Sequence, residues 1–256
     1  MIIISYDVAS KSLALSVINF NENWKRDLNN LLPYYNKIKE ASIEDKCDAI
    51  LMYLNKLNEI IDKIIEPMLF DVVDLIPGKK LKETDTIMRA ERLKAYLNSV
   101  DDFISSYKIN KINKNPGEKT NYNTKILLEY QMGPNDKSRN VGSQILYHYS
   151  NSDNGFKSSY ISNAGEIVKD ISIEIIGPSL KNKINLDPTN NYQSFIRKYT
   201  KTYDANKKHS IANMMVWLKQ KNKLEMISKI KKSNYDDIAD AITMTLAWIH
   251  LKSGYI

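Results

Sequence analysis

Cysteine is almost absent from this chain of 256 residues, which contains Cys47 alone. A single cysteine forms no internal disulfide and cannot build a cysteine-based zinc site. Glycine and proline are also scarce, with 8 and 7 residues, so the composition does not favour long disordered tracts. Because 43% of the residues are hydrophobic, we expect one domain with an elaboration, built on a substantial core.

Long apolar runs and the common cofactor motifs are missing as well. No stretch has the length of a transmembrane helix, and the apolar run at 1–4 is too short for a signal peptide, so we expect an intracellular protein with no membrane partner. The sequence has no P-loop and no dinucleotide-binding fingerprint. The histidines lack metal-ligand spacing, and nothing supports a hydrolytic triad. Acidic residues therefore remain as the candidates for catalytic chemistry.

Positive charge is concentrated near the C-terminus. Residues 195–232 contain eleven Lys or Arg and two acids, a net charge of +9 that exceeds the +7 of the whole chain. Two interpretations are open: a solvated lysine-rich surface, or a face that binds phosphates, which we favour.

Hydrophobic patterns predict an alternation of strands and helices. Two β-branched runs at 2–8 and 13–20 predict a hairpin, and 21–36 is a polar connection. Further strands are expected at 71–76, 124–130 and 170–177, with helices at 43–66, 85–107, 137–149, 210–220 and 234–251. Alternation in the second half predicts parallel strands with crossover helices. The expected fold class is α/β, with a mixed five-stranded sheet flanked by helices and one inserted helix.

The inserted helix, which we place within 36–68, has an apolar stripe. Its residues follow an alternating spacing of four and three: Ile43, Cys47, Ile50, Leu54, Leu57, Ile61 and Ile64. Helix 85–107 repeats this spacing. These helices pack either within the chain, which we favour, or on a second subunit.

Two carboxylates stand at the ends of expected strands. Asp7 closes the first apolar run, and Glu129 follows Leu127 and Leu128. Each alone is explained as an ordinary strand-end residue. If the two strands are parallel neighbours about 4.8 Å apart, however, both acids reach the same sheet edge, where open α/β sheets bind ligands.

Asp237 and Asp240 share one face of the last expected helix, because they are three residues apart. Ser233 and Asp236 have capping-box spacing, which explains Asp236 as a helix-start acid. Asp240 is flanked by alanines that allow close packing on the sheet, so it requires a metal or a basic partner. Carboxylates and water form the hard oxygen site that Mg²⁺ or Mn²⁺ prefers.

Taken together, the stretches SYDVA, LLEYQ and YDDIAD, in this order, resemble the poxvirus-type (RuvC-like) Holliday junction resolvases of the RNase H-like superfamily. A Lys-Lys pair ahead of an apolar helix, here Lys207-Lys208, is similar as well. The resemblance covers the core. The helix in 36–68 and the loop 151–165 depart from it.

The resemblance implies a viral, magnesium-dependent endonuclease, active as a homodimer on four-way DNA junctions in the host cytoplasm. It implies metal ligation by Asp7, Glu129, Asp237 and Asp240, with Lys207 or Lys208 beside the scissile phosphate. Residues 1–256 then form one nuclease domain, with 195–232 as the DNA-binding segment and 233–252 as the catalytic helix. We expect DNA contacts from Lys11, Lys137, Arg139, Arg197, Lys198, Lys201, Lys207 and Lys208.

An apolar wedge into the junction is also implied, by Met132 or Tyr130, with core packing as the alternative. Two other functions stay open. One is an RNase H-like nuclease acting on other branched or hybrid nucleic acids. The other is a non-catalytic DNA-binding protein, which leaves Asp240 unexplained.

Overall fold

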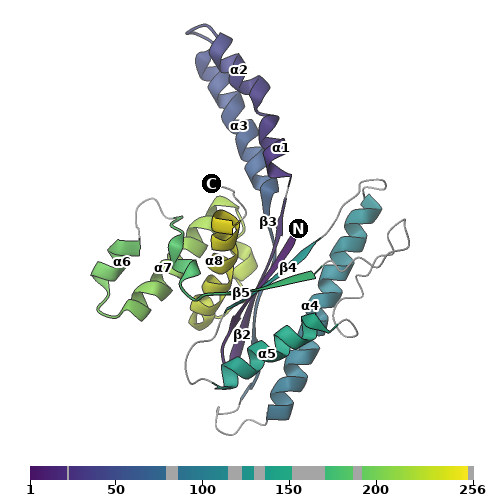
Figure 1. Ribbon diagram of the computed structural model, residues 1–256. Helices are drawn as coiled ribbons and strands as arrows, with labels where there is room; N and C mark the ends of the chain where they lie inside the picture. Colours follow the sequence, from purple (N-terminus) through teal and green to yellow (C-terminus); the bar gives the residue numbers. More distant parts are fainter. Residues whose placement is uncertain are drawn as a thin grey trace.

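The computed structural model describes residues 1–21, 23–78, 86–114, 123–129, 136–151, 171–186 and 192–252. Its centre is a five-stranded sheet with the order β3-β2-β1-β4-β5 (Figure 1). The strands are β1 Ile2–Val8, β2 Ser12–Phe20, β3 Ile65–Asp74, β4 Thr124–Glu129 and β5 Ile171–Ile176. Neighbours are antiparallel from β3 to β1 and parallel from β1 to β5. The predicted mixed five-stranded sheet is therefore confirmed.

Both faces of the sheet are covered, which explains the nearly unbroken apolar runs of β1 and β4. Alternate side chains of β1 enter two separate cores: Ile3 joins the core beneath helix α8 (Tyr235–Lys252), and Ile2 and Ile4 join the core beneath α4 (Thr86–Lys114). The side-chain period of two in a strand produces this division. Every odd-numbered position of β1 and β4 therefore faces α8.

The helices divide between these faces (Figure 1). The α8 face also holds α6 Tyr192–Lys198, α7 Thr202–Gln220 and the short 3-10 turns η2 Leu180–Lys183, η3 Leu224–Ile227 and η4 Lys232–Asn234. The opposite face holds α4 and α5 Asp136–Ser150. In the described part of the chain, no helix has the length and apolar character needed to cross a membrane.

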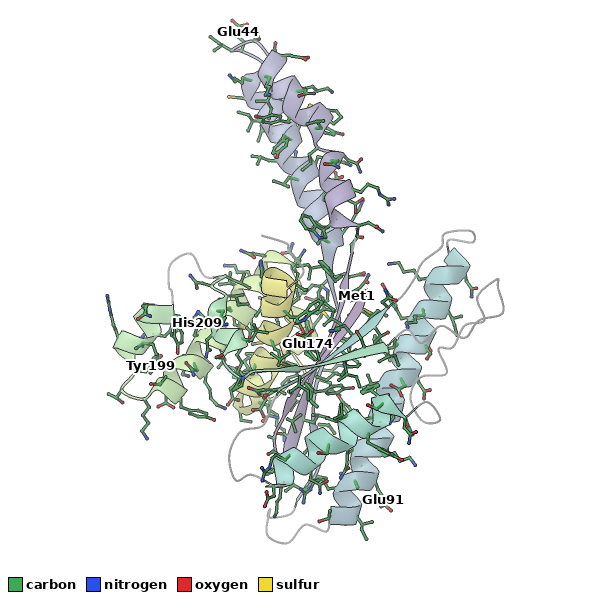
Figure 2. The ribbon with its side chains drawn as sticks, viewed as in Figure 1. Met1, Glu44, Glu91, Glu174, Tyr199 and His209 are labelled. Carbon is green, nitrogen blue, oxygen red and sulfur yellow. The ribbon has the colours of Figure 1, made fainter. Side chains whose placement is uncertain are left out.

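Three helices between β2 and β3 form an arm that projects from the sheet, with Glu44 at its tip (Figure 2). They are α1 Trp24–Asn29, α2 Leu32–Glu40 and α3 Lys46–Ile64. The insertion was predicted at 36–68. The arm begins earlier, at Trp24, and ends earlier, at Ile64. The polar stretch 21–36 is largely helical because α1 and α2 pack on α3. Residues 65–68 belong to β3, paired with β2, and Pro67 disfavours helix there.

The apolar stripe of α3 is only partly buried. Ile64 is fully buried at the base of the arm, whereas Ile43 is 92% exposed at its tip. Ile50 and Leu54 are exposed too. The face that packs inward contains Leu57 of the stripe together with Tyr53 and Ile60. Packing within the chain, as predicted, therefore holds for α3, but the exposed stripe residues take little part in it.

Two helix boundaries differ from prediction because buried polar residues extend the packing. Helix α4 continues to Lys114, and the Lys108 ammonium on this extension donates to the Thr124 hydroxyl at 3.0 Å. Helix α7 begins at Thr202, eight residues early, and buries His209 in the extension. Hydropathy gives no signal for such polar contacts.

Candidate active site

The strand register places Asp7 and Glu129 together. Tyr6 is level with Leu128 on the neighbouring parallel strand, so the next residues of both strands reach the same carboxyl edge. Both acids occupy odd-numbered positions and face α8. The adjacency predicted from the sequence is therefore confirmed.

Helix α8 brings Asp240 to the same edge. Ala239 and Ala241 are fully buried, and the Ser5 and Thr245 hydroxyls are hydrogen-bonded between β1 and α8. Such close contact requires small residues in this part of the helix. Asp240 is held against the sheet, as its alanine neighbours predicted.

Lys181 lies between these acids. It follows β5 in η2, and its Nζ donates to Asp240 Oδ2 at 2.6 Å and lies 3.2 Å from Glu129 Oε1. The side chains of Lys181, Asp240 and Glu129 are 14%, 14% and 10% exposed. One cation thus joins the ends of two strands to a helix. We name Asp7, Glu129, Asp240 and Lys181 the edge cluster.

Burial shapes the electrostatics of the edge cluster. It raises the pKa of Asp7 well above its ordinary value, and a hydrogen bond with Glu129 raises that pKa further, while the Lys181 charge opposes the rise. Burial also raises the pKa of Asp240, again against Lys181. Burial lowers the pKa of Lys181, but Asp240, Asp7 and Glu129 outweigh this and raise it above the ordinary value. Asp7 and Asp240 therefore resist ionisation, and the Lys181 amine stays charged.

Asp237 lies one helical turn before Asp240 and has a different partner. It accepts a hydrogen bond from the Ser12 hydroxyl at 3.1 Å, and its pKa is raised by burial and by Asp236. Asp236 is bound to the Lys207 ammonium. Asp236 lies in the first turn of α8, as predicted for a helix-start acid, and it also serves as the counterion of Lys207.

The oxygen donors of the edge cluster fit a hard divalent ion. Among the described residues, Asp240 Oδ1 is buried and has no hydrogen bond of ordinary length, although the nearby Ser210 hydroxyl lowers the pKa of Asp240, so one carboxylate oxygen is available inside the cluster. The acids close around the Lys181 ammonium, and within the described ranges no three acidic, histidine or cysteine side chains form a ready-made metal site. The donor chemistry matches a metal, while the geometry matches a monovalent cation.

The expected DNA-binding residues lie on several elements. Arg197, Lys198, Lys201 and Lys208 are exposed along α6 and α7, and Lys11 is exposed in the β1–β2 turn. These positions are on the α8 side or at the carboxyl edge. Arg139 pairs with Asp136 on α5, beside Lys137, and so belongs to the opposite face. Met132 and Tyr130 lie outside the described residues.

Sequence reasoning missed Lys181 entirely. The available signal was position: Lys181 stands five residues beyond the end of β5, the third parallel strand, after the Gly177-Pro178 break. Charge density gave no help, because this lysine precedes the basic segment. Only the sheet order shows that β5 ends beside β4.

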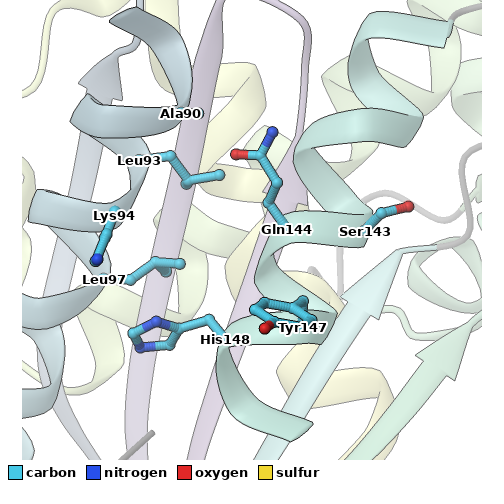
Figure 3. Close-up of a pocket in the computed structure, with 8 residues that line it drawn as sticks. All are labelled: Ala90, Leu93, Lys94, Leu97, Ser143, Gln144, Tyr147 and His148. Carbon is cyan, nitrogen blue, oxygen red and sulfur yellow. The ribbon is translucent and has the colours of Figure 1, made fainter. Parts of the chain in front are cut away.

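A separate apolar pocket of about 510 Å³ lies between α4 and α5 (Figure 3). Its lining residues are Ala90, Leu93, Lys94, Leu97, Ser143, Gln144, Tyr147 and His148. None is a carboxylate, and the sheet separates this pocket from the edge cluster. The imidazole of His148 is hydrogen-bonded to buried Asp101 at 2.8 Å, so the pocket wall is held by a polar contact.

Comparison with known proteins gives a family match in the C-terminal part of the chain and a similar solved structure. Curated proteins give no match. Among solved structures, a crystal structure of Fowlpox virus resolvase with substrate Holliday junction DNA is similar at 14% identity and a TM-score of 0.40, covering 97% of each chain. Residues 191–252 match the family model described as Poxvirus A22 protein. This segment contains α6, α7 and α8, with Lys207-Lys208 and YDDIAD, so the resemblance predicted from these motifs is confirmed over the C-terminal part of the chain.

Proposed function

We propose that this protein is a viral, magnesium-dependent endonuclease that resolves four-way DNA junctions. The observation that carries the proposal is the edge cluster, in which acids from β1, β4 and α8 converge at the carboxyl edge of the sheet. The family match over 191–252 and the ordered motifs supply the substrate class. The metal, the cut and the individual residue roles are parts of this proposal.

Each acid has a part in the proposed chemistry. Asp7, Glu129 and Asp240 would hold the metal, and Asp237 would complete the ligand set from the preceding turn of α8, where the Ser12 hydroxyl orients its carboxylate. A magnesium ion held by these acids would supply the chemistry of the cut, since a bound divalent ion can activate a water and stabilise a leaving oxygen. Lys207, fixed by Asp236, adds positive charge at the approach to Asp237.

The basic residues of α6 and α7 support binding of a polyanion. Arg197, Lys198, Lys201 and Lys208 are exposed on the face that also contains α8. Contacts between these side chains and phosphates make affinity strongly dependent on salt. Paired cuts in a nearly two-fold junction require two sites related by a dyad, so the proposed active form is a homodimer. The proposed place of action is the host cytoplasm.

A cleavage assay tests this function. Purified protein is incubated with a synthetic four-way junction, a linear duplex, a replication fork and an RNA–DNA hybrid, each with and without Mg²⁺. We expect paired nicks in the junction only with Mg²⁺. Preference for the hybrid would instead make the protein a nuclease of another substrate class, and salt-sensitive binding without any cutting would make it a DNA-binding protein.

The matched variants are Asp240→Asn and Asp204→Asn. Asp240→Asn is expected to lower cleavage about 10³-fold while junction binding is retained, because only the metal ligand is lost. Asp204 is an exposed acid on α7, so its variant carries the same charge change outside the site. Equal cleavage by the Asp240→Asn variant and the wild type would reject the assigned site.

A further inference from the structure

The edge cluster contains one cation and three acids in a largely buried setting. Lys181 Nζ is 2.6 Å from Asp240 and 3.2 Å from Glu129, and Asp7 lies close enough to interact with both carboxylates. Ionised carboxylates at such a site repel one another unless a cation lies between them. In the structure, that cation is the Lys181 ammonium.

A divalent ion would use the same carboxylates, because carboxylate oxygens are the ligands that Mg²⁺ prefers. An ion held by Glu129 and Asp240 would lie close to the space that the Lys181 ammonium occupies, since Nζ is 3.2 Å and 2.6 Å from their oxygens. The positive charges of the ion and the ammonium would repel strongly in a partly buried site. The ammonium and the metal therefore compete for these carboxylates.

We propose that Lys181 is the resident counter-cation of the metal-free site, and that a divalent ion binds by displacing its ammonium from Glu129 and Asp240. The inference rests on the proposed function, because it takes the edge cluster to be the metal site. Lys181 thereby lowers the affinity for metal and holds the acids together until metal arrives. It is a positioning residue, since it acts through the carboxylates.

The chain provides a matched control in Lys125. This lysine of β4 pairs with Glu174 of β5 at 3.1 Å, and its side chain is 16% exposed, close to the 14% of Lys181. The Lys125 pair also contacts α8, because the Trp248 indole donates to Glu174. Removal of Lys125 therefore reproduces the loss of a buried lysine without touching the edge cluster.

The experiment is Mn²⁺ binding to the full-length protein, without DNA, by isothermal titration calorimetry. The wild type, Lys181→Met and Lys125→Met are compared at one pH. We expect Lys181→Met to bind Mn²⁺ about tenfold more tightly than the wild type, since the competing cation is gone. Lys125→Met is expected to bind as the wild type does. Equal or weaker binding by Lys181→Met, or no binding by any of the three proteins, would overturn the inference.

Two further measurements keep the inference testable if Lys181→Met does not fold. If Lys181→Met does not fold without metal, the protein is refolded with and without Mn²⁺; recovery only with Mn²⁺ supports displacement, and no recovery with it contradicts displacement. Lys181→Arg keeps the charge, so it is expected to retain affinity within about threefold of the wild type. Junction cleavage is scored separately. If the wild type cuts the junction but Lys181→Met binds Mn²⁺ no more tightly than the wild type, only the inference about Lys181 is rejected. If Lys181→Met binds Mn²⁺ more tightly but the wild type does not cut the junction, only the proposed function is rejected.

Discussion

Two lysine-centred clusters lie between the sheet and α8, at opposite ends of β4. At one end Lys125 is paired with Glu174, which also accepts a hydrogen bond from the Trp248 indole at 2.9 Å. At the carboxyl edge, Lys181 faces Asp240, Glu129 and Asp7. One acid faces the lysine at the first end, and three acids face it at the second.

This difference indicates that the Lys125 pair has a structural role and that the edge cluster has a functional one. A buried lysine with one acid and a hydrogen-bonded neighbour satisfies its polar atoms and links two strands. The edge cluster leaves Asp240 Oδ1 without a hydrogen bond of ordinary length among the described residues and keeps acids whose pKa is raised by burial. Folding alone does not favour such a surplus of acid. A ligand of opposite charge explains it.

The largest expected contrast is in catalysis. Glu129→Gln should reduce junction cleavage about 10³-fold, because it removes a charged metal ligand. Glu174→Gln makes the same isosteric change on the neighbouring strand and should leave cleavage within about twofold. Single-turnover cleavage with excess enzyme measures both rates. Similar losses of cleavage rate in the two variants would show that Glu129 has no catalytic role that Glu174 lacks.

The next contrast is in stability without metal. Lys181→Met leaves three acids without their cation and should lower the free energy of unfolding by about 3 kcal/mol near pH 8. Lys125→Met leaves only Glu174 without its cation, and Glu174 keeps the hydrogen bond from Trp248. The free energy of unfolding should therefore fall by about 1 kcal/mol. Urea denaturation in a metal-chelating buffer gives both values. A larger loss for Lys125→Met would reverse the comparison.

The pH dependence of stability should reveal the raised pKa of Asp7 in the edge cluster. Because the pKa of Asp7 is raised, the folded protein keeps a proton that the unfolded chain releases. Stability from this group is full below the unfolded pKa and is lost as pH rises through the folded pKa. Metal-free wild type should therefore lose about 1 kcal/mol relative to Asp7→Asn between about pH 4 and pH 8. Urea denaturation across this range measures the difference, and a flat difference would contradict it.

The smallest contrast concerns single hydrogen-bond donors. Ser12→Ala removes the donor to Asp237, and Trp248→Phe removes the donor to Glu174. Trp248→Phe should destabilise by about 1 kcal/mol with unchanged Mn²⁺ affinity. Ser12→Ala should cost less stability but slow cleavage about threefold, because the Asp237 carboxylate loses its orientation. Thermal unfolding and calorimetry distinguish the two outcomes, and altered Mn²⁺ affinity in Trp248→Phe would count against the comparison.

The local sequence pattern was sufficient to predict those parts of the fold that depend on neighbouring residues in the chain. Apolar runs ended at Asp7 and Glu129, and these strands form as predicted with the two acids adjacent. The alanines beside Asp240 predicted its close approach to the sheet. The arm was harder, because α1 and α2 are polar helices that form by packing on α3 and carry little hydrophobic pattern of their own.

The sequence alone was enough to predict four of the five strands, the last helix and three of the four members of the edge cluster, because side-chain periodicity and strand ends are local properties. The third strand, expected at 71–76, is Ile65–Asp74. Tertiary structure alone decided that Lys181 lies among those acids and that Lys207 is bound to Asp236. Both pairings join residues far apart in the chain. Their partners follow from sheet order and from the seating of α8, since the energy of a buried charge depends on which groups surround it and not on its neighbours in sequence.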